Sequence, residues 1–373
     1  MNSPVRQLPL RFSPSSRAGE THTNLSAVRT DGEHLWVAGD ETATVERLTA
    51  QRSADGEVTG YAEQVTVDLA DLVDLPAGGE EEADLEGIAR NGPWLWAIGS
   101  HSLKRKKIRD DDSDAKARKR LGKVVREDNR YVLVRLPIDP ATGLPARSVE
   151  VDGEELTAAV LGAHDDALTD LLADDDLIAP FLRIPSKDNG VDVEGIAVHH
   201  RDDGELRVYV GFRGPVLRGW AVVVEVRPET HPKHPDRLEL TRFGDGPGEG
   251  ERYRLHLLDL GGLGVRDLCP HGEDLLVLAG PSMSLSGPVR VHRWVGACAA
   301  DGAEVVRPDE LPVVLDLPHG RGEDHAEGIA VLPPDAHGTG HDEQLLVVLD
   351  SPAASRHTGD GGMLADVWDL PPA

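Results

Sequence analysis

A short motif recurs along this sequence, in which a glutamate precedes a glycine, an isoleucine and an alanine. The motif stands at residues 85–89, 193–197 and 326–330, with a looser copy at 266–269 and a weaker one at 24–28. Each copy is followed by a turn rich in Gly, Asp, Asn or Pro and then by an apolar, strand-like run. Carboxyl groups at one repeated position of a strand can bind a cation or transfer protons.

The repeated acidic position supplies the candidate metal ligands. They are Glu86, Glu194, Asp267 and Glu327, each near the start of its strand. Oxygen ligands without cysteine and with little histidine favour Ca²⁺, with Mg²⁺ or Mn²⁺ as second choices, over Zn²⁺. The sequence therefore predicts a divalent cation, Ca²⁺ in preference, as the cofactor.

If the repeats form the blades of a β-propeller, as argued below, these carboxylates surround its narrow central channel. Carboxylates so close together repel one another, so their charge must be compensated. The compensation can be a raised pKa, a bound cation, or ion pairs with Lys104, Arg213, Arg218 or Arg266. A purely structural alternative also stands. Carboxylates at such positions can accept hydrogen bonds from a neighbouring blade and serve only to hold the blades together.

The elements that carry these residues are short strands. Apolar runs at 35–38, 95–98, 208–211, 275–278 and 345–348 predict second strands, and 43–48, 130–136, 220–226, 289–294 and 363–368 predict third strands. The sequence thus predicts an all-β fold, a single β-propeller over residues 1–373. We expect five blades, or six if residues 147–151 add one, with residues 6–12 closing the ring. The first strand of each blade would line the central channel.

Two segments interrupt the repeat. Residues 104–127 are mostly charged and predict a solvated loop or helix between a second and a third strand. Residues 154–172 carry Leu156, Val160, Ala163 and Leu171 at helical spacing, which predicts an amphipathic helical insertion packed on the propeller wall.

Composition narrows the partners. Among 373 residues, 66 acidic against 39 basic side chains give a formal charge of -27, which disfavours duplex nucleic acid as a partner. The sequence has no apolar run typical of a signal peptide or a membrane span, so we expect a cytoplasmic protein without a membrane partner. Cys269 and Cys298 are too few for a disulfide framework, and we expect both to be reduced. Oligomeric state is left open.

The order of several phrases resembles a bacterial family catalogued as domain of unknown function three-six-one-six. The phrases lie at residues 35–41, 99–102, 129–133, 211–216, 265–268 and 279–281, and the resemblance runs from about residue 24 to about residue 356. More distantly, the Glu-Gly-Ile-Ala repeats resemble the esterase-like phytase and gluconolactonase propellers. That resemblance implies metal ligands at the inner-strand acids, which here are Glu86, Glu194, Glu327 and Asp267.

Two functions follow as hypotheses. The first is a metal-dependent hydrolase of a small anionic ester, with phosphoesters ahead of lactones, at the top of the channel. Arg213 and Arg266 would bind the anion and His101 would move a proton. The alternative is a non-catalytic propeller that binds a small ligand or a protein on its top face.

Overall fold

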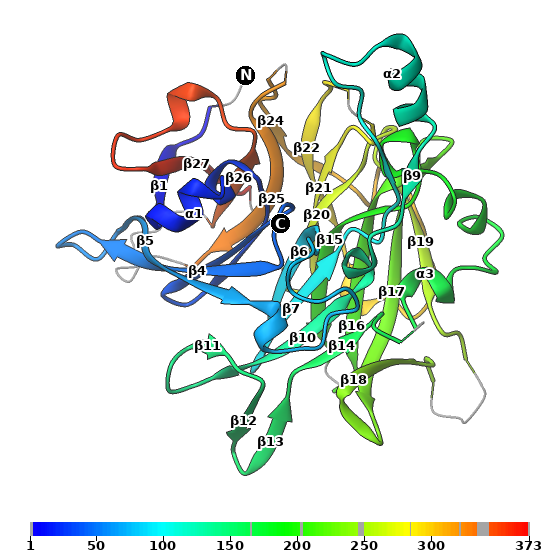
Figure 1. Ribbon diagram of the computed structural model, residues 1–373. Coiled ribbons are helices and arrows are strands. Elements are labelled where there is room, and N and C mark those ends of the chain that lie inside the picture. Colours follow the sequence, from blue (N-terminus) through cyan, green and yellow to red (C-terminus); the bar gives the residue numbers. More distant parts are fainter. Residues whose placement is uncertain are drawn as a thin grey trace.

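The computed structural model describes residues 3–164, 166–201, 204–244, 250–283, 285–320, 322–333 and 343–371. Strands dominate this part of the chain (Figure 1), and its α-helices are short: α1 (Pro14–Ala18), α2 (Asp114–Leu121) and α3 (Leu168–Leu171). No helix in these ranges is long and apolar enough to cross a membrane. The prediction of an all-β fold is confirmed.

Most strands form antiparallel units in which consecutive strands pair. The first unit contains β2 (Leu25–Asp31), β3 (His34–Gly39), β4 (Thr44–Arg52) and β5 (Val58–Asp68). The second contains β6 (Leu85–Asn91), β7 (Trp94–Gly99), β10 (Leu133–Asp139) and β14 (Ala159–Leu161). Their central strands are continuous apolar runs because both faces of each sheet are covered by neighbours.

The third unit contains β15 (Asp192–His200), β16 (Leu206–Leu217) and β17 (Trp220–His231). The first half of β17 pairs with β19 (Arg254–Asp259), and its second half pairs with β18 (His234–Thr241). The fourth contains β20 (Gly264–His271), β21 (Asp274–Gly280), β22 (Val289–Trp294) and β24 (Val313–Leu317). The fifth contains β25 (His325–Leu332), β26 (Gln344–Asp350) and β27 (Gly362–Asp369). Four two-residue or four-residue pieces flank these units: β11 (Leu144–Pro145), β12 (Ser148–Val151), β13 (Glu154–Thr157) and β23 (Val305–Val306).

The N-terminal strand completes the last unit. β1 (Arg6–Arg11) pairs with β27 in antiparallel register from Arg6↔Val367 to Arg11↔Gly362, as the sequence predicts. β1 also meets β5 in a parallel bridge at Leu10↔Tyr61, so the first and last units share one sheet. The first strand of the chain is thereby hydrogen-bonded to the last one.

The innermost strands contact one another in a closed cycle, in the order β2, β6, β15, β20, β25 and back to β2. In Figure 1, β6, β15, β20 and β25 lie near the middle of the molecule, and β5, β18 and β19 lie toward its periphery. Hydrophobic clusters fill the spaces between neighbouring units. Representative members are Trp36, Trp96, Tyr61, Trp294 and Trp368, each in a different cluster.

The predicted helix over residues 154–172 is wrong. The segment contains β13, then β14 as the outer strand of its unit, and only α3 is helical. β12 and β13 form a hairpin across Asp152 and Gly153, whose φ angles of 52° and 85° match a type I′ turn. This turn signal outweighs the helical spacing of the apolar residues.

The charged segment 104–127 lies between β7 and β10, where the sequence analysis places it. It consists of the paired β8 (Lys104–Arg105) and β9 (Val124–Val125) with α2 between them, and Figure 1 shows α2 projecting from the body. No residue of α2 is buried. The segment is a solvated arm, because it has almost no apolar surface to bury.

Candidate functional site at the channel mouth

Each innermost strand carries an irregularity in pairing at one equivalent residue. The register of the pairs skips Ser26 in β2, Glu86 in β6, Glu194 in β15, Arg266 in β20 and Glu327 in β25. A β-bulge leaves the extra residue outside the ladder and re-aims its side chain, and bulges are common beside functional sites. These five residues therefore form one pseudo-equivalent layer of the channel, which we call the bulge layer.

The glycine after each bulged glutamate has a packing reason. A Cβ added to Gly87 would lie 2.9 Å from Ile196 Cγ2, and one added to Gly195 would lie 2.9 Å from the backbone nitrogen of Leu268. A Cβ on Gly328 would lie 2.9 Å from Val348 Cγ2. The repeated Glu-Gly-Ile sequence thus combines a side chain aimed at the channel with close approach of neighbouring strands.

This alignment corrects the position assigned to Asp267. In the looser repeat, Arg266 is the residue equivalent to the glutamates, and Asp267 is equivalent to the glycines. Asp267 accepts hydrogen bonds from the backbone of Leu268 and Ile329 at 2.7 and 2.8 Å and from both terminal nitrogens of Arg29 at 2.7 and 2.8 Å. Its oxygens are fully used within the protein, so Asp267 does not fit the role of a metal ligand.

Arg29 lies between the innermost strands, three residues after Ser26 of the bulge layer. It stands where the other repeats have Ala89, Ala197, Cys269 and Ala330, and it is 4% exposed. Besides Asp267, its guanidinium donates to the carbonyls of Val28 and Ile329 at 2.6 Å, of Ile196 at 3.1 Å, and of Leu268. Although burial opposes it, Asp267 raises the pKa of Arg29. One permanently charged side chain thus ties four of the innermost strands together and forms the floor of the site.

Two arginines above this floor are already paired with carboxylates. Arg213, in the second half of β16, contacts Asp192 and Glu194. Arg266 contacts Glu327 Oε2 at 2.6 Å and Glu194 Oε2 at 3.1 Å. The sequence predicts that these arginines bind a substrate anion, but in the structure both are paired with carboxylates of the protein itself.

The pKa values of the two glutamates in these ion pairs are shifted in opposite directions. Burial raises the pKa of Glu194 to about 8 against the opposing effect of Arg213 and Arg266. At Glu327 the two arginines outweigh burial and lower the pKa. Of these two coupled glutamates, Glu194 is therefore the more easily protonated and Glu327 the more readily ionised beside Arg266.

Glu86 is the glutamate of the bulge layer that lacks a cation. Its carboxyl group has no hydrogen bond or ion pair with any residue that the structure describes, in contrast to Glu194 and Glu327. Burial, followed by the charges of Asp84 and Glu194, raises its pKa well above the ordinary value. Such an unpartnered, strongly perturbed carboxyl group in a channel marks a candidate functional residue.

Asp40 and Asp350 are two further acids without an ion pair among the described residues. With the bulge layer they form one end of the cycle of innermost strands, which we call the mouth. They occupy equivalent positions directly after β3 and at the end of β26, and the backbone of Asn24 bridges to Asp350. Asp40 Oδ1 is buried without a hydrogen-bond partner within the described ranges, and burial with the nearby charges of Asp84 and Asp350 raises the pKa of Asp40 to about 7. Burial followed by the charge of Glu327 also raises the pKa of Asp350. Asp350 accepts a hydrogen bond from Ser351 Oγ at 3.1 Å, and none of these three acids has an ion pair with a residue that the structure describes. We call Asp40, Glu86 and Asp350 together the free carboxyl group.

His101 does not face the mouth as expected. It is 1% exposed, its Nδ1 lies 2.9 Å from the Gly99 carbonyl, and its ring packs edge-on against Tyr131 at 5.8 Å. Burial lowers its pKa to about 4, which leaves the ring neutral. The carbonyl can only accept a hydrogen bond, so Nδ1 carries the proton and Nε2 is an enclosed acceptor. This placement fits a structural residue better than a proton shuttle.

A metal ion does not fit the predicted ligand set. Within the residues described, no three Asp, Glu, His or Cys side chains gather so as to hold a metal ion. Glu194 and Glu327 are engaged by arginines, Asp267 is engaged by Arg29, and Glu86 is left by itself. In place of the predicted cation, the structure has guanidinium groups.

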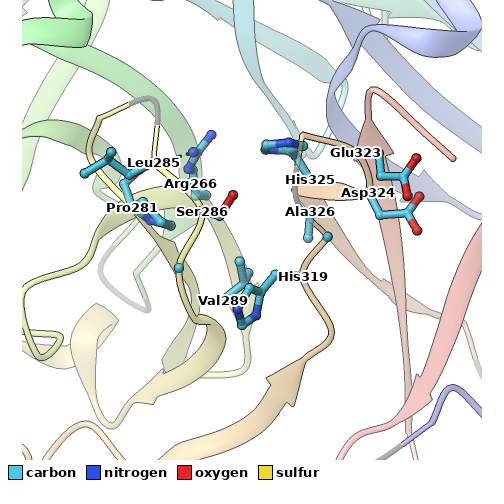
Figure 2. A pocket seen from close by; sticks show the side chains of 12 residues that line it. Arg266, Pro281, Leu285, Ser286, Val289, His319, Glu323, Asp324, His325 and Ala326 are labelled. Atoms are coloured by element: carbon cyan, nitrogen blue, oxygen red, sulfur yellow. Dashed lines mark hydrogen bonds between the residues drawn. The ribbon is translucent and has the colours of Figure 1, made fainter.

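A pocket opens beside the mouth between the fourth and fifth units (Figure 2). Arg266 and Leu285 lie on one side of it, and His325, Glu323 and Asp324 lie on the other. Ser286 and His319 supply further polar groups. Since Arg266 belongs to the bulge layer and His325 pairs with Asp350 in the strand ladder, the pocket adjoins the mouth. Its volume of about 20 Å³ is room for about one water molecule.

Sequence reasoning missed two residues that shape this site, Arg29 and Arg130. Arg130 contacts Asp84 and lies 2.7 Å from Glu127 Oε2, so it neutralises an acid at the mouth. A signal for Arg29 was present, because a long cation replaces the alanine of the repeated motif in the first copy. For Arg130 we find no comparable pattern.

Residues 24–366 match the model of the family described as "Protein of unknown function (DUF3616)". No curated protein sequence matches this chain significantly.

Solved structures with some likeness include the glutaminyl cyclase of Myxococcus xanthus, at 11% identity and a TM-score of 0.37 over 99% of this chain and 97% of that chain. The xylan beta-1,4-xylosidase of Bacillus halodurans C-125 has 9% identity and a TM-score of 0.36 over 98% of this chain and 54% of that chain. The periplasmic gluconolactonase of Pseudomonas aeruginosa has 12% identity and a TM-score of 0.24 over 94% and 68%. TM-scores this low identify neither the fold nor the activity of this chain.

Proposed function

Because the chain belongs to the family described as protein of unknown function (DUF3616), which names no activity, we propose its function from the site alone. We propose a hydrolase of a small ester, with the free carboxyl group at the channel mouth as its acid–base machinery. We also infer that the five antiparallel units are the blades of one five-bladed propeller, in support of which the innermost strands contact in a closed cycle.

The observation that carries the proposal is the contrast between equivalent glutamates. Glu194 and Glu327 are held by arginines, whereas Glu86 has no cation in the part of the chain described. An acid kept protonated by its surroundings can donate a proton, and a neighbouring acid that ionises near pH 7 can accept one. Glu86 is the proton donor in this proposal, and Asp40, with a pKa of about 7, is the base that activates water.

The balance of atoms is that of ester hydrolysis. Asp40 removes a proton from water, and the hydroxide oxygen attacks the carbonyl carbon. The bond to the leaving oxygen then breaks, and Glu86 gives that oxygen its proton. General acid–base catalysis of this kind contributes about 10²–10⁴-fold. A neutral ester such as a lactone is preferred over a phosphoester, because Arg213 and Arg266 are already paired.

The test is a panel of lactones and carboxylate esters assayed with wild type and Glu86→Gln. We expect turnover by the wild type, a 10²–10⁴-fold lower kcat in Glu86→Gln, and no comparable loss in Glu41→Gln, an exposed acid beside Asp40. The pH profile of kcat/KM should rise through about 7 as Asp40 ionises. Equal rates for wild type and Glu86→Gln would contradict the proposal.

A second function is favoured by one observation, the surplus of unpaired carboxyl groups on one side of the mouth. That surplus suits a non-catalytic module that binds a small ligand with a cationic group. Thermal stabilisation by a primary amine such as butylamine, lost in Glu86→Gln and unaccompanied by turnover of any ester, would select this function over the hydrolase.

A further inference from the structure

A second cavity lies on the outer side of the molecule, away from the channel mouth. It has a volume of about 280 Å³ and lies between the connector that follows β5, the strand β14 and the strand β18. None of the residues that line it belongs to an innermost strand. Its size approaches that of typical small-molecule sites, which begin at about 300 Å³.

The inner wall of this cavity is apolar and tightly packed. Val73, Ala158 and Val160 line it, and they are 4%, 2% and 3% exposed. All three belong to the hydrophobic cluster between the first and second units. An apolar group of a ligand would therefore be bounded by side chains that are already fixed by the core.

Two arginines stand at the rim of the same cavity. The parallel bridge Val160↔Arg237 between β14 and β18 sets Arg237 beside the apolar wall. Arg147, on the segment between β11 and β12, also lines the cavity, and it contacts the Asp71 carbonyl at 3.4 Å and Asp74 at 3.8 Å. Asp74 and Asp236 also line the rim, and both are exposed to solvent.

Arg237 differs from the arginines of the channel. Its side chain makes no hydrogen bond or ion pair with any other described residue, and its Nε is buried without a partner. Arg213, Arg266 and Arg130, by contrast, all contact carboxylates. A guanidinium with a buried, unpartnered donor beside an apolar wall matches a ligand that has both an apolar body and an anionic end.

We propose that this cavity binds a small aliphatic carboxylic acid. The carboxylate accepts hydrogen bonds from Arg237, with Arg147 as a second cation at longer range, and the aliphatic chain packs on Val73, Ala158 and Val160. The site is independent of the hydrolase proposed for the channel mouth, since the two share no residue.

Isothermal titration with sodium octanoate tests the site, and octanamide serves as the neutral control of the same length. We expect saturable binding of octanoate and at least tenfold weaker binding of octanamide. Arg237→Gln should weaken octanoate binding about 10–100-fold, the loss expected for a charge-assisted hydrogen bond. Arg252→Gln, a change at an exposed arginine outside the cavity, should leave binding unchanged.

Two further variants separate this site from others. Ala158→Leu fills the cavity and should abolish octanoate binding, while Glu86→Gln at the channel mouth should leave it unchanged. Absence of octanoate binding, equal binding of octanoate and octanamide, or undiminished binding by Arg237→Gln would each overturn the proposal. The Arg237→Gln result decides the matter even if Ala158→Leu does not fold.

Discussion

At the scale of single residues, equivalent positions in this chain have diverged in charge. One position of the repeat holds Ser26, Glu86, Glu194, Arg266 and Glu327. Ser26 is neutral, Glu86 is an acid without an ion pair, and the other three are held in ion pairs. Because Arg266 lies between two of the glutamates, it satisfies both and leaves Glu86 without a partner. Asymmetry of charge among equivalent positions therefore distinguishes the side of the mouth on which the reaction is proposed.

Asp40→Asn should stabilise the protein at neutral and higher pH. The folded protein raises the pKa of Asp40 from 3.8 to about 7, so ionisation destabilises the folded state as pH rises through this range. We expect a gain of about 1–3 kcal/mol in the free energy of unfolding above pH 7, after allowance for solvent screening, and no difference near pH 3. Urea titrations across this pH range measure it. A variant that is less stable than wild type at pH 8 would contradict the assignment.

Glu327→Gln should destabilise the protein, in contrast to Asp40→Asn. It removes one partner of a buried ion pair with Arg266, which costs about 3–5 kcal/mol. The arginines lower the pKa of Glu327, so its contribution is present above its ordinary pKa of 4.5 and is lost as pH falls through the lower folded value. Denaturation curves at pH 7 and pH 4 check this, with exposed Glu323→Gln as the control. Equal effects of the two variants would contradict the ion pair.

At the scale of elements, the strands were predictable and their side-chain partners were not. The runs 35–38, 95–98 and 275–278 fall within β3, β7 and β21, because strands buried on both faces require continuous apolar sequence. The helix predicted over 154–172 is absent from most of that range. The turn at Asp152-Gly153 pairs residues 154–157 with β12 as a hairpin, and this turn outweighs the helical spacing of a few apolar residues. The glutamate positions of the site were predicted as well. Which of them meets an arginine depends on contacts between distant strands, and spacing along the chain does not encode those contacts.

The arm formed by β8, α2 and β9 should be the first site of proteolysis. It is exposed and rich in Lys and Arg, and it leaves and rejoins the body at β7 and β10, which pair with each other directly at Leu133↔Ile98. Its contact with the body through Arg105 and Asp188, at 2.7 Å, is an exposed ion pair. Brief digestion with trypsin should cut within residues 104–127, and the nicked protein should elute at the same volume and melt within a few degrees of the intact protein. Dissociation of the two fragments without denaturant would contradict this.

At the scale of the whole molecule, the fold depends on joining the two ends of the chain. β1 bonds to β27 along six residue pairs and reaches β5 through one more. Leu8, Leu10 and Phe12 are 2%, 0% and 4% exposed in the cluster between the first and last units. A segment at the extreme N-terminus thus contributes to a core whose other members come from both ends of the chain.

Deletion of residues 1–12 should therefore cost most of the stability. Loss of three buried apolar side chains amounts to about 5–9 kcal/mol, which is comparable to the entire free energy of unfolding of a typical domain. Calorimetry should show a large fall in melting temperature or no cooperative transition. Deletion of residues 1–4 alone is the control. A variant without residues 1–12 that melts like wild type would show that β1 is dispensable.

Arg29 has a kinetic consequence. Because its guanidinium lies between the innermost strands beneath the bulge layer, a molecule bound at the proposed site would enter and leave on the same side. A product still in the site therefore keeps the next substrate out. If the mouth hydrolyses esters, inhibition by the released acid or alcohol is competitive with substrate, and turnover at high conversion is limited by escape through a single opening.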